Sequence, residues 1–170
     1  LNLYLPGQCG GEAGARLLFG EANPSGKLAE TWYKHYTDVP YGEEYSKKAN
    51  EFYKESVFVG YRFAKTAKIK TAFPFGFGLS YTDFEYKNLA VTKENGVVTA
   101  TLTVRNTGNR DGAEVVQLYV KNNENSAVFK PESELCAFAK VYLKAGEEKT
   151  VSLSFALSAL SFWNVKENAW

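Results

Sequence analysis

Residues 97–108, VVTATLTVRNTG, carry the pattern that decides the fold of this 170-residue chain. Apolar residues stand at the even positions from 98 to 104, and Thr or Arg stands at the odd positions from 99 to 105. Successive side chains of a β-strand point to opposite faces, so this alternation predicts a strand with one buried face. Asn106, Thr107 and Gly108 then favour a turn that ends the strand.

Four further stretches extend this pattern on both sides at a spacing of about ten residues. They are FEYKNLAVTK at 84–93, AEVVQLYVKN at 113–122, ELCAFAKVYL at 134–143 and KTVSLSFAL at 149–157. Short strands separated by turn residues are typical of an antiparallel β-sandwich. SFWNV at 161–165 would be a sixth strand. Since such a sandwich usually has about seven strands, we expect the domain at 84–170 to lack its last strand.

Residues 1–33 have a different pattern, which predicts a strand, a Gly-rich loop, a helix, a loop and an extended segment. Leu1, Leu3 and Leu5 alternate as in a strand already under way. The helix follows near residues 13–18, and Gly20 suits its C-terminal end. This βαβ-like unit is too small to fold alone, because sheets of this class bury both faces. We therefore expect the chain to be part of a longer polypeptide.

Between these two regions, residues 34–56 are polar and charged and are predicted to form a surface loop. VFVGYRF at 57–63 favours a strand with an aromatic face. TAFPFGFGLSY at 71–81 is so rich in Phe, Pro and Gly that neither a helix nor a long strand is expected. We predict that it forms an aromatic junction where two domains meet.

Composition excludes several classes of function. Twenty Lys and Arg balance nineteen Asp and Glu, so no nucleic-acid partner is expected. No apolar run approaches the ~20 residues that span a bilayer, so no membrane partner is expected. Cys9 and Cys136 lie far apart and lack the local spacing of a metal site. His35 lies in a Tyr-rich stretch without a nucleophile motif, and we expect it to be a surface or packing residue.

Six motifs together resemble the C-terminal part of glycoside hydrolase family 3, the β-glucosidase and β-xylosidase family. They are PGQCGGEA at 6–13, LLFGEANPSGKL at 17–28, ESVFVGYRF at 55–63, FPFGFGLSYTDFEY at 73–86, VRNTGNRDGAEVVQLYV at 104–120 and ELCAFAKVYLKAGEEKTV at 134–151. The resemblance implies an α+β fragment. Residues 1–80 would be the end of an α/β sandwich domain with its linker, and residues 84–170 a fibronectin type III-like β-sandwich. The parent protein would also hold a (β/α) barrel, upstream or downstream.

The family chemistry is retaining hydrolysis by two carboxylates about 5–5.5 Å apart. The resemblance implies that the nucleophilic Asp lies in the barrel and that the acid/base Glu lies upstream of the segment at 6–13. We find neither motif here, so we expect no catalytic, cofactor-binding or metal-binding residue and no activity of the isolated chain. Six glutamates that could be considered as substitutes are expected to be solvated: Glu12, Glu21, Glu43, Glu44, Glu147 and Glu148.

The aromatic residues carry two interpretations. Those of the loop either pin it to the domain surfaces, which we favour, or stack against sugar rings: Tyr33, Tyr36, Tyr41, Tyr45, Phe52 and Tyr53. Those of the junction are expected to be structural, with Gly76 and Gly78 allowing tight turns between them: Phe73, Phe75, Phe77 and Tyr81.

Two functions follow from the sequence. The first is a non-catalytic scaffold within an exo-acting glycosidase that cleaves terminal β-linked glucose or xylose, with the missing barrel and a β-glucoside as partners. The second is a free-standing β-sandwich module that binds carbohydrate or protein. Exposed apolar surface and an open sheet edge would favour a homo-oligomer or a companion chain. The compartment stays open, although two cysteines and the lack of a signal peptide at 1–10 favour the cytoplasm.

Overall fold

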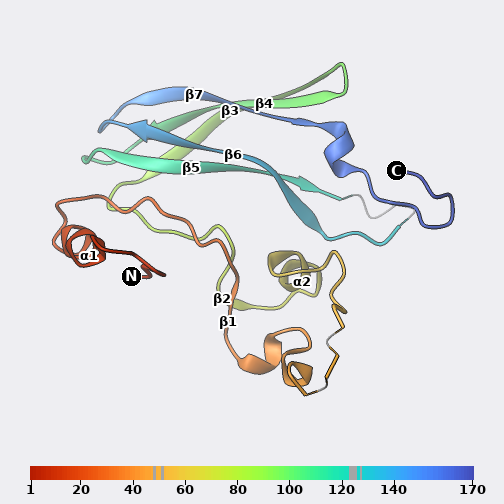
Figure 1. The fold of residues 1–170 in the computed structure, drawn as a ribbon. Helices are drawn as coiled ribbons and strands as arrows, with labels where there is room; N and C mark the ends of the chain where they lie inside the picture. Colours follow the sequence, from red (N-terminus) through yellow and green to blue (C-terminus); the bar gives the residue numbers. More distant parts are fainter. Residues whose placement is uncertain (48, 51, 123–125, 127) are drawn as a thin grey trace.

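The computed structural model describes residues 1–47, 49–50, 52–122, 126 and 128–170 (Figure 1). Its largest part is a two-layered antiparallel β-sandwich. One sheet has the strand order β3-β4-β7, and the other pairs β5 with β6. The strands are β3 (Phe84–Glu94), β4 (Val97–Asn106), β5 (Gly112–Lys121), β6 (Ser133–Leu143) and β7 (Glu148–Ala156). The five strands predicted from the sequence are confirmed.

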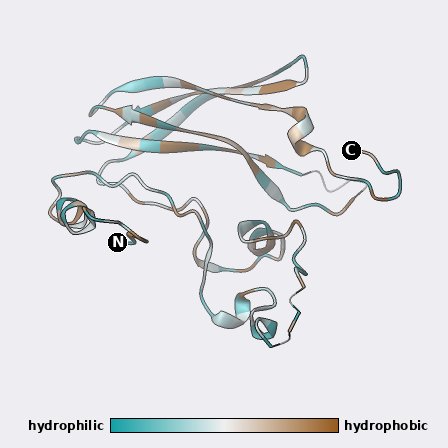
Figure 2. Ribbon diagram, viewed as in Figure 1, coloured by the Kyte–Doolittle hydropathy of each residue, from teal (hydrophilic) through white to brown (hydrophobic). Residues whose placement is uncertain are grey.

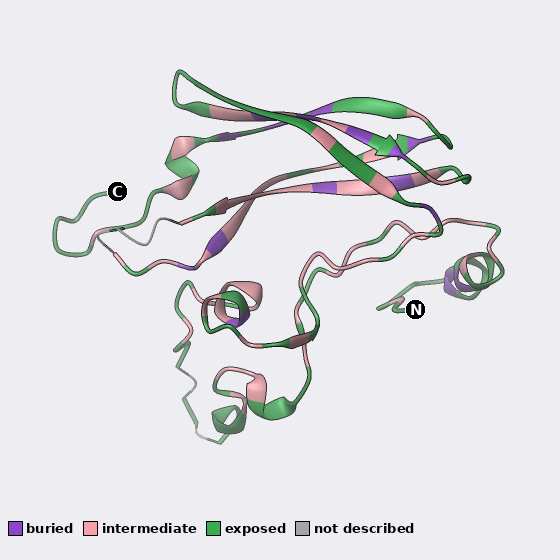
Figure 3. Cartoon of the chain, turned by 180° about the vertical axis from the view of Figure 1, so that it is seen from behind, coloured by how far each residue is buried: buried purple, intermediate pink, exposed green. Residues whose placement is uncertain are grey.

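The core of the sandwich lies between the two sheets. It is built from Leu102, Val104, Val116, Leu143, Val151 and Leu153. The alternation in β4 is confirmed, since Val104 is fully buried while the Thr99 hydroxyl lies outside, 2.8 Å from the Ser154 hydroxyl of β7. Apolar and polar residues alternate along the strands in Figure 2, and the buried residues concentrate where the sheets face each other in Figure 3.

Residues 1–82 run along the outer side of the β5-β6 sheet, away from β3, β4 and β7 (Figures 1 and 3). They contain α1 (Gly10–Leu18), α2 (Tyr61–Thr66) and a short antiparallel pair, β1 (Trp32–Tyr33) with β2 (Thr71–Phe73). Three 3-10 turns complete the elements: η1 (Tyr36–Asp38), η2 (Gly42–Glu44) and η3 (Leu157–Leu160). The predicted helix is confirmed as α1, and Gly20 follows it with φ of 76°.

Three expected strands are absent from the described residues. At 57–63, Gly60 turns the chain with φ of 58° and α2 begins at Tyr61. Residues 1–5 form no strand, and residues 161–165 contribute only a single bridge from Asn164 to Ala169. A strand becomes stable when a neighbour satisfies its backbone hydrogen bonds. None of these segments has such a neighbour in the described ranges, so their apolar alternation alone does not produce a strand.

Candidate functional site

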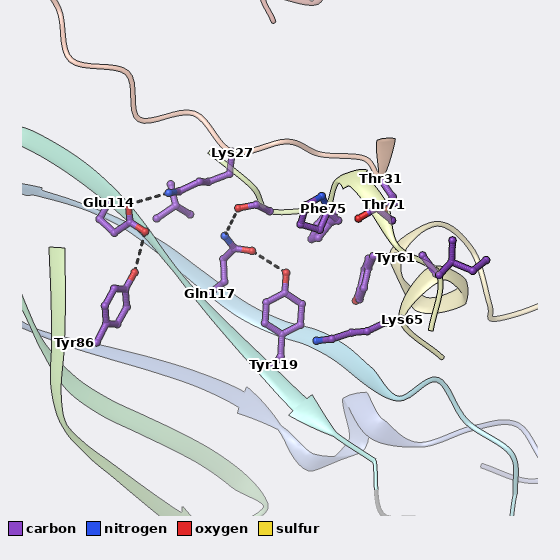
Figure 4. A pocket seen from close by; sticks show the side chains of 15 residues that line it. Lys27, Thr31, Tyr61, Lys65, Thr71, Phe75, Tyr86, Glu114, Gln117 and Tyr119 are labelled. Atoms are coloured by element: carbon purple, nitrogen blue, oxygen red, sulfur yellow. Dashed lines mark hydrogen bonds and ion pairs between the residues drawn. The ribbon is translucent and has the colours of Figure 1, made fainter. Parts of the chain in front are cut away.

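A pocket of about 570 Å³ lies at the boundary between residues 1–82 and the sandwich. Its walls come from β5, from Tyr86 of β3, from α2, from Thr71 of β2 with the PFG segment at 74–76, and from Lys27 and Thr31 (Figure 4). We call the contacts between residues 1–82 and the sandwich the junction. Phe75 stacks on Tyr61 at a centroid distance of 4.7 Å and Tyr61 meets the Tyr119 ring edge-on at 5.9 Å, so Phe75 takes part in an aromatic contact with the sandwich. Phe73 and Phe77 pack against each other instead, at a centroid distance of 5.1 Å.

An ion pair between Lys27 and Glu114 connects the two parts of the chain inside this pocket. The Lys27 Nζ lies 3.0 Å from Glu114 Oε2 and donates a second hydrogen bond of 3.1 Å to the Gly78 carbonyl. The two side chains are only 15% and 13% exposed. The Tyr86 hydroxyl donates to Glu114 Oε1 at 2.9 Å, so both carboxylate oxygens have a partner (Figure 4). Because both side chains are shielded from water, removing one charge would leave the other without a counter-charge in a poorly solvated site.

The Tyr86 phenol is held in its neutral form by this arrangement. Burial raises its pKa, and the charge of Glu114 and the hydrogen bond to it raise the pKa further. A group whose pKa is higher in the folded state contributes stability that is complete below its unfolded pKa, here 10.0, and is lost as the pH rises above that value. We expect the Tyr86→Phe variant to lose less stability between pH 10 and 12 than the wild type. Urea unfolding across this range measures the difference, with Tyr53→Phe as an exposed control; equal slopes in all three proteins would contradict the prediction.

Gln117 on β5 forms a second polar contact across the junction. Its Nε2 donates to the Gly76 carbonyl at 3.1 Å, and its Oε1 accepts a 2.8 Å hydrogen bond from the Tyr119 hydroxyl. Gly76 has φ of 79°, and a Cβ at this position would lie 2.2 Å from Gln117 Oε1. The expected tight turn at Gly76 is therefore confirmed.

Gly78 is needed for close approach rather than for an unusual φ. A Cβ at this position would lie 2.2 Å from the backbone oxygen of Gly26, which cannot move as a side chain can. We expect Gly78→Ala to destabilise the junction by about 1–3 kcal/mol, the usual cost of overpacking. Urea unfolding measures this, with Gly11→Ala as the control, since nothing lies within 4 Å of a Cβ there. A Gly78→Ala midpoint equal to that of the control would show that the backbone accommodates the methyl group.

A third set of contacts holds the end of the linker near α1. The Asn23 Oδ1 accepts hydrogen bonds from the Ser80 hydroxyl at 2.9 Å and the Tyr81 N–H at 2.8 Å. The Tyr81 hydroxyl donates to the Leu17 carbonyl at 2.7 Å, and the Arg110 guanidinium lies 5.5 Å from the Tyr81 ring. The chain near residues 17–23 is thus attached to the loop between β4 and β5.

Asn106, at the end of β4, organises that loop from inside. It is fully buried, and its Oδ1 accepts hydrogen bonds from the Thr82 hydroxyl at 2.6 Å and the Gly108 N–H at 3.1 Å. Its Nδ2 donates to the carbonyls of Arg110 at 2.7 Å and Leu143 at 3.3 Å. One amide therefore joins the linker, the β4-β5 loop and the end of β6.

The six glutamates considered as possible catalytic residues do not line the pocket between residues 1–82 and the sandwich. Glu12, Glu43 and Glu148 are exposed, and Glu21 lies 3.7 Å from Arg16 at the surface. Glu44 pairs with Lys54, and both side chains are more than a third exposed.

Glu147 has a shifted pKa for a local reason. A hydrogen bond from the Lys144 backbone N–H and then one from the Lys149 side chain lower its pKa. Lys144 lies in the β6-β7 turn and Lys149 near the start of β7, so the shift reflects local structure around this turn rather than a functional site.

The other candidates also lie outside the pocket. Cys9 is exposed and Cys136 half-buried, and both are free thiols. The backbone N–H of His35 donates to Asp38 at the start of η1. Within the described part of the chain, no cluster of three His, Cys, Asp or Glu residues is arranged to hold a metal ion. No described helix is long and apolar enough to cross a membrane.

The loop aromatics are only partly anchored. Tyr33 donates to the Gly60 carbonyl at 3.3 Å, and Tyr36 donates to the Gly42 carbonyl within the same loop. Tyr45, Phe52 and Tyr53 are 71–94% exposed.

The polar residues that join residues 1–82 to the sandwich were not expected from the sequence, although the strand positions of two of them indicated burial. Counting in steps of two from Val104 places Asn106 on the buried face, and counting back from Val116 places Glu114 on the buried face of β5. A polar residue in a core-facing position requires a partner when it is buried. Lys27 carried no comparable signal.

Comparisons with known proteins agree with this architecture. Residues 1–81 match the glycosyl hydrolase family 3 C-terminal domain, and residues 114–170 match the fibronectin type III-like domain. Over its whole length, the chain is 44% identical to the thermostable beta-glucosidase B of Acetivibrio thermocellus, and it spans 23% of that protein. The whole chain is also 42% identical to an exo-alpha-(1->6)-L-arabinopyranosidase of Bifidobacterium longum, and it spans 23% of that protein.

Solved structures show the same fold. A GH3 beta-glucosidase of Bifidobacterium adolescentis matches 99% of the chain with a TM-score of 0.93 and 40% identity. DesR, a beta-glucosidase from Streptomyces venezuelae solved with D-glucose, matches 98% with a TM-score of 0.87 and 38% identity. The chain covers 25% and 22% of these two proteins. Together with the sandwich and its aromatic junction, these matches show that the chain belongs to glycoside hydrolase family 3 and corresponds to the C-terminal part of its members.

Proposed function

We propose that this chain is the C-terminal part of a retaining, exo-acting glycoside hydrolase that removes terminal β-linked glucose or xylose. The observation that carries the proposal is the match of the whole chain to about a quarter of a beta-glucosidase, at 44% identity. Similarity at this level over two consecutive domains supports a shared parent architecture. The catalytic carboxylates would lie in the remaining part of the enzyme.

We further propose that the chain itself is a scaffold. Residues 1–80 would end the α/β sandwich domain, and residues 84–170 would form the fibronectin type III-like domain. The Lys27–Glu114 pair and the Gln117–Gly76 hydrogen bond support this role, since each joins the two regions. The surface positions of the candidate carboxylates support the absence of a catalytic residue here.

The test uses the enzyme that contains this segment and three chromogenic substrates. We expect it to hydrolyse p-nitrophenyl β-D-glucopyranoside or β-D-xylopyranoside faster than the α-L-arabinopyranoside, which is included because the similar protein of Bifidobacterium longum is an exo-alpha-(1->6)-L-arabinopyranosidase. Proton NMR of the first product should show the β-anomer, since a covalent intermediate retains configuration. A preference for the arabinopyranoside would overturn the substrate class, and an inverted product would overturn the mechanism.

The scaffold role predicts that the isolated chain releases no p-nitrophenol from these substrates above a buffer blank. In the full enzyme, neutralising an exposed candidate such as Glu12→Gln or Glu43→Gln should leave kcat within about twofold, because exposed charges away from the reacting atoms contribute little. Turnover by the isolated chain that disappears in one of these variants would contradict the prediction.

A free-standing binding module is the second candidate, and the exposed loop aromatics favour it. Tyr45 and Tyr53 are 75% and 94% exposed, so their faces are available for stacking on sugar rings. This function requires the isolated chain to bind a β-glucan oligosaccharide in calorimetric titration and to lose that binding in Tyr45→Ala. Absence of binding, together with glycosidase activity of the full enzyme, would exclude it.

A further inference from the structure

The outer face of the β5-β6 sheet is covered on one strand and open on the other. Ala113 and Gln117 of β5 pair in register with Tyr142 and Phe138 of β6. Residues directly opposite in an antiparallel pair lie on the same face of the sheet. Ala113 is 5% exposed, and Gln117 donates a hydrogen bond to the Gly76 carbonyl. Phe138 and Tyr142, in contrast, are 68% and 67% exposed. Residues 1–82 therefore cover only the β5 half of this face.

The uncovered half combines two aromatic rings with a cation. Phe138 and Tyr142 are four residues apart on one strand, which places them about 13 Å from each other on the same face. Lys140 lies between them with its ammonium 5.5 Å from the centre of the Tyr142 ring. Lys140 makes no ion pair within the described ranges. Two large exposed rings on one face of a strand are typical of a surface that another protein surface covers.

We propose that Phe138, Lys140 and Tyr142 form an interdomain contact surface that the remaining part of the enzyme's α/β domain covers. This inference rests on the proposed function, which places that domain in the same polypeptide. The surface is continuous with the junction through the register of β5 and β6, and the segment that covers β5 belongs to the stretch at 1–81 that matches the family's C-terminal domain. The occupant is an apolar surface with a carboxylate facing Lys140.

Hydroxyl-radical footprinting of the full enzyme tests the surface directly. Oxidation of each residue is compared in the native and the urea-unfolded enzyme, with Phe129 and Tyr53 as references of the same residue types, 79% and 94% exposed. We expect Phe138 and Tyr142 to be protected at least about fivefold more than Phe129 and Tyr53. Equal protection overturns the proposal. Protection that appears only at concentrations where light scattering detects a dimer also overturns it, because a second copy would then be the occupant.

A double variant, Phe138→Ser with Tyr142→Ser, provides a second measurement in the full enzyme. We expect its Tm to fall by several degrees. The control is Val91→Ser on β3, in the other sheet, where the side chain is 62% exposed; we expect it to leave the Tm unchanged. An unchanged Tm in the double variant overturns the proposal. Glucosidase activity is measured on the same samples. An active enzyme with an unprotected surface refutes the contact alone, whereas a protected surface in an enzyme inactive on all three glycosides refutes the proposed function alone.

Discussion

Replacing Lys27 by methionine is expected to destabilise the protein by about 3–5 kcal/mol, the usual cost of removing one partner of a buried ion pair. The Glu114 carboxylate would keep its hydrogen bond from Tyr86 but would lose its cation in a site where it is 13% exposed. The Gly78 carbonyl would lose a donor at the same time. Most of the effect comes from the carboxylate left without a counter-charge, because methionine replaces much of the apolar stem of Lys27.

The Lys27→Met, Glu114→Gln double variant separates this penalty from the net value of the pair. A neutral amide tolerates the pocket better than an unpaired carboxylate, so the double variant should be more stable than Lys27→Met alone. Lys87→Met is the matched control. Lys87 pairs with Glu85 at 2.8 Å, but both side chains are more than a third exposed. The expected loss in this control is therefore about 0–1 kcal/mol. Urea unfolding measures all three variants; similar losses for Lys27→Met and Lys87→Met would show that water screens the junction pair.

Asn106→Ala is expected to cost about 3–4 kcal/mol, because buried polar groups that lose a partner cost about 1–3 kcal/mol each. The substitution leaves the Thr82 hydroxyl, the Gly108 N–H and the carbonyls of Arg110 and Leu143 without this partner. The side chain is fully buried. Part of the loss should be recovered if water enters the cavity, which keeps the expected value below the sum of four groups.

Two comparisons make the Asn106 prediction specific. Asn109→Ala, on the exposed side of the same loop, should change stability by less than about 0.5 kcal/mol. Asn106→Asp keeps the acceptor but removes both N–H donors and buries a carboxyl group, so it should be at least as destabilising as Asn106→Ala at neutral pH. Thermal or urea unfolding of the three variants tests this order. A stable Asn106→Ala variant would mean that the linker and loop are held by their other contacts.

Much of the sandwich could be predicted from the sequence because its signals are local. The alternation at 98–105 places Val104 in the core, and the turn residues Thr107–Gly108 and Ala145–Gly146 fall between the observed strands. The family resemblance was equally available, since its motifs are short and lie in the order that the matched domains require. Periodicity and turn chemistry need no knowledge of distant parts of the chain.

The sequence by itself thus determined the strands of the sandwich, helix α1 and the family. Only the tertiary structure decided whether an apolar segment becomes a strand, as at 57–63, where α2 packs against β6 instead. It also decided that Lys27 meets Glu114, although 87 positions separate them, and that one half of the β5-β6 outer face is covered while Phe138 and Tyr142 stay exposed. A pattern along the chain fixes which way a side chain points, but the partner that it meets depends on how distant segments pack.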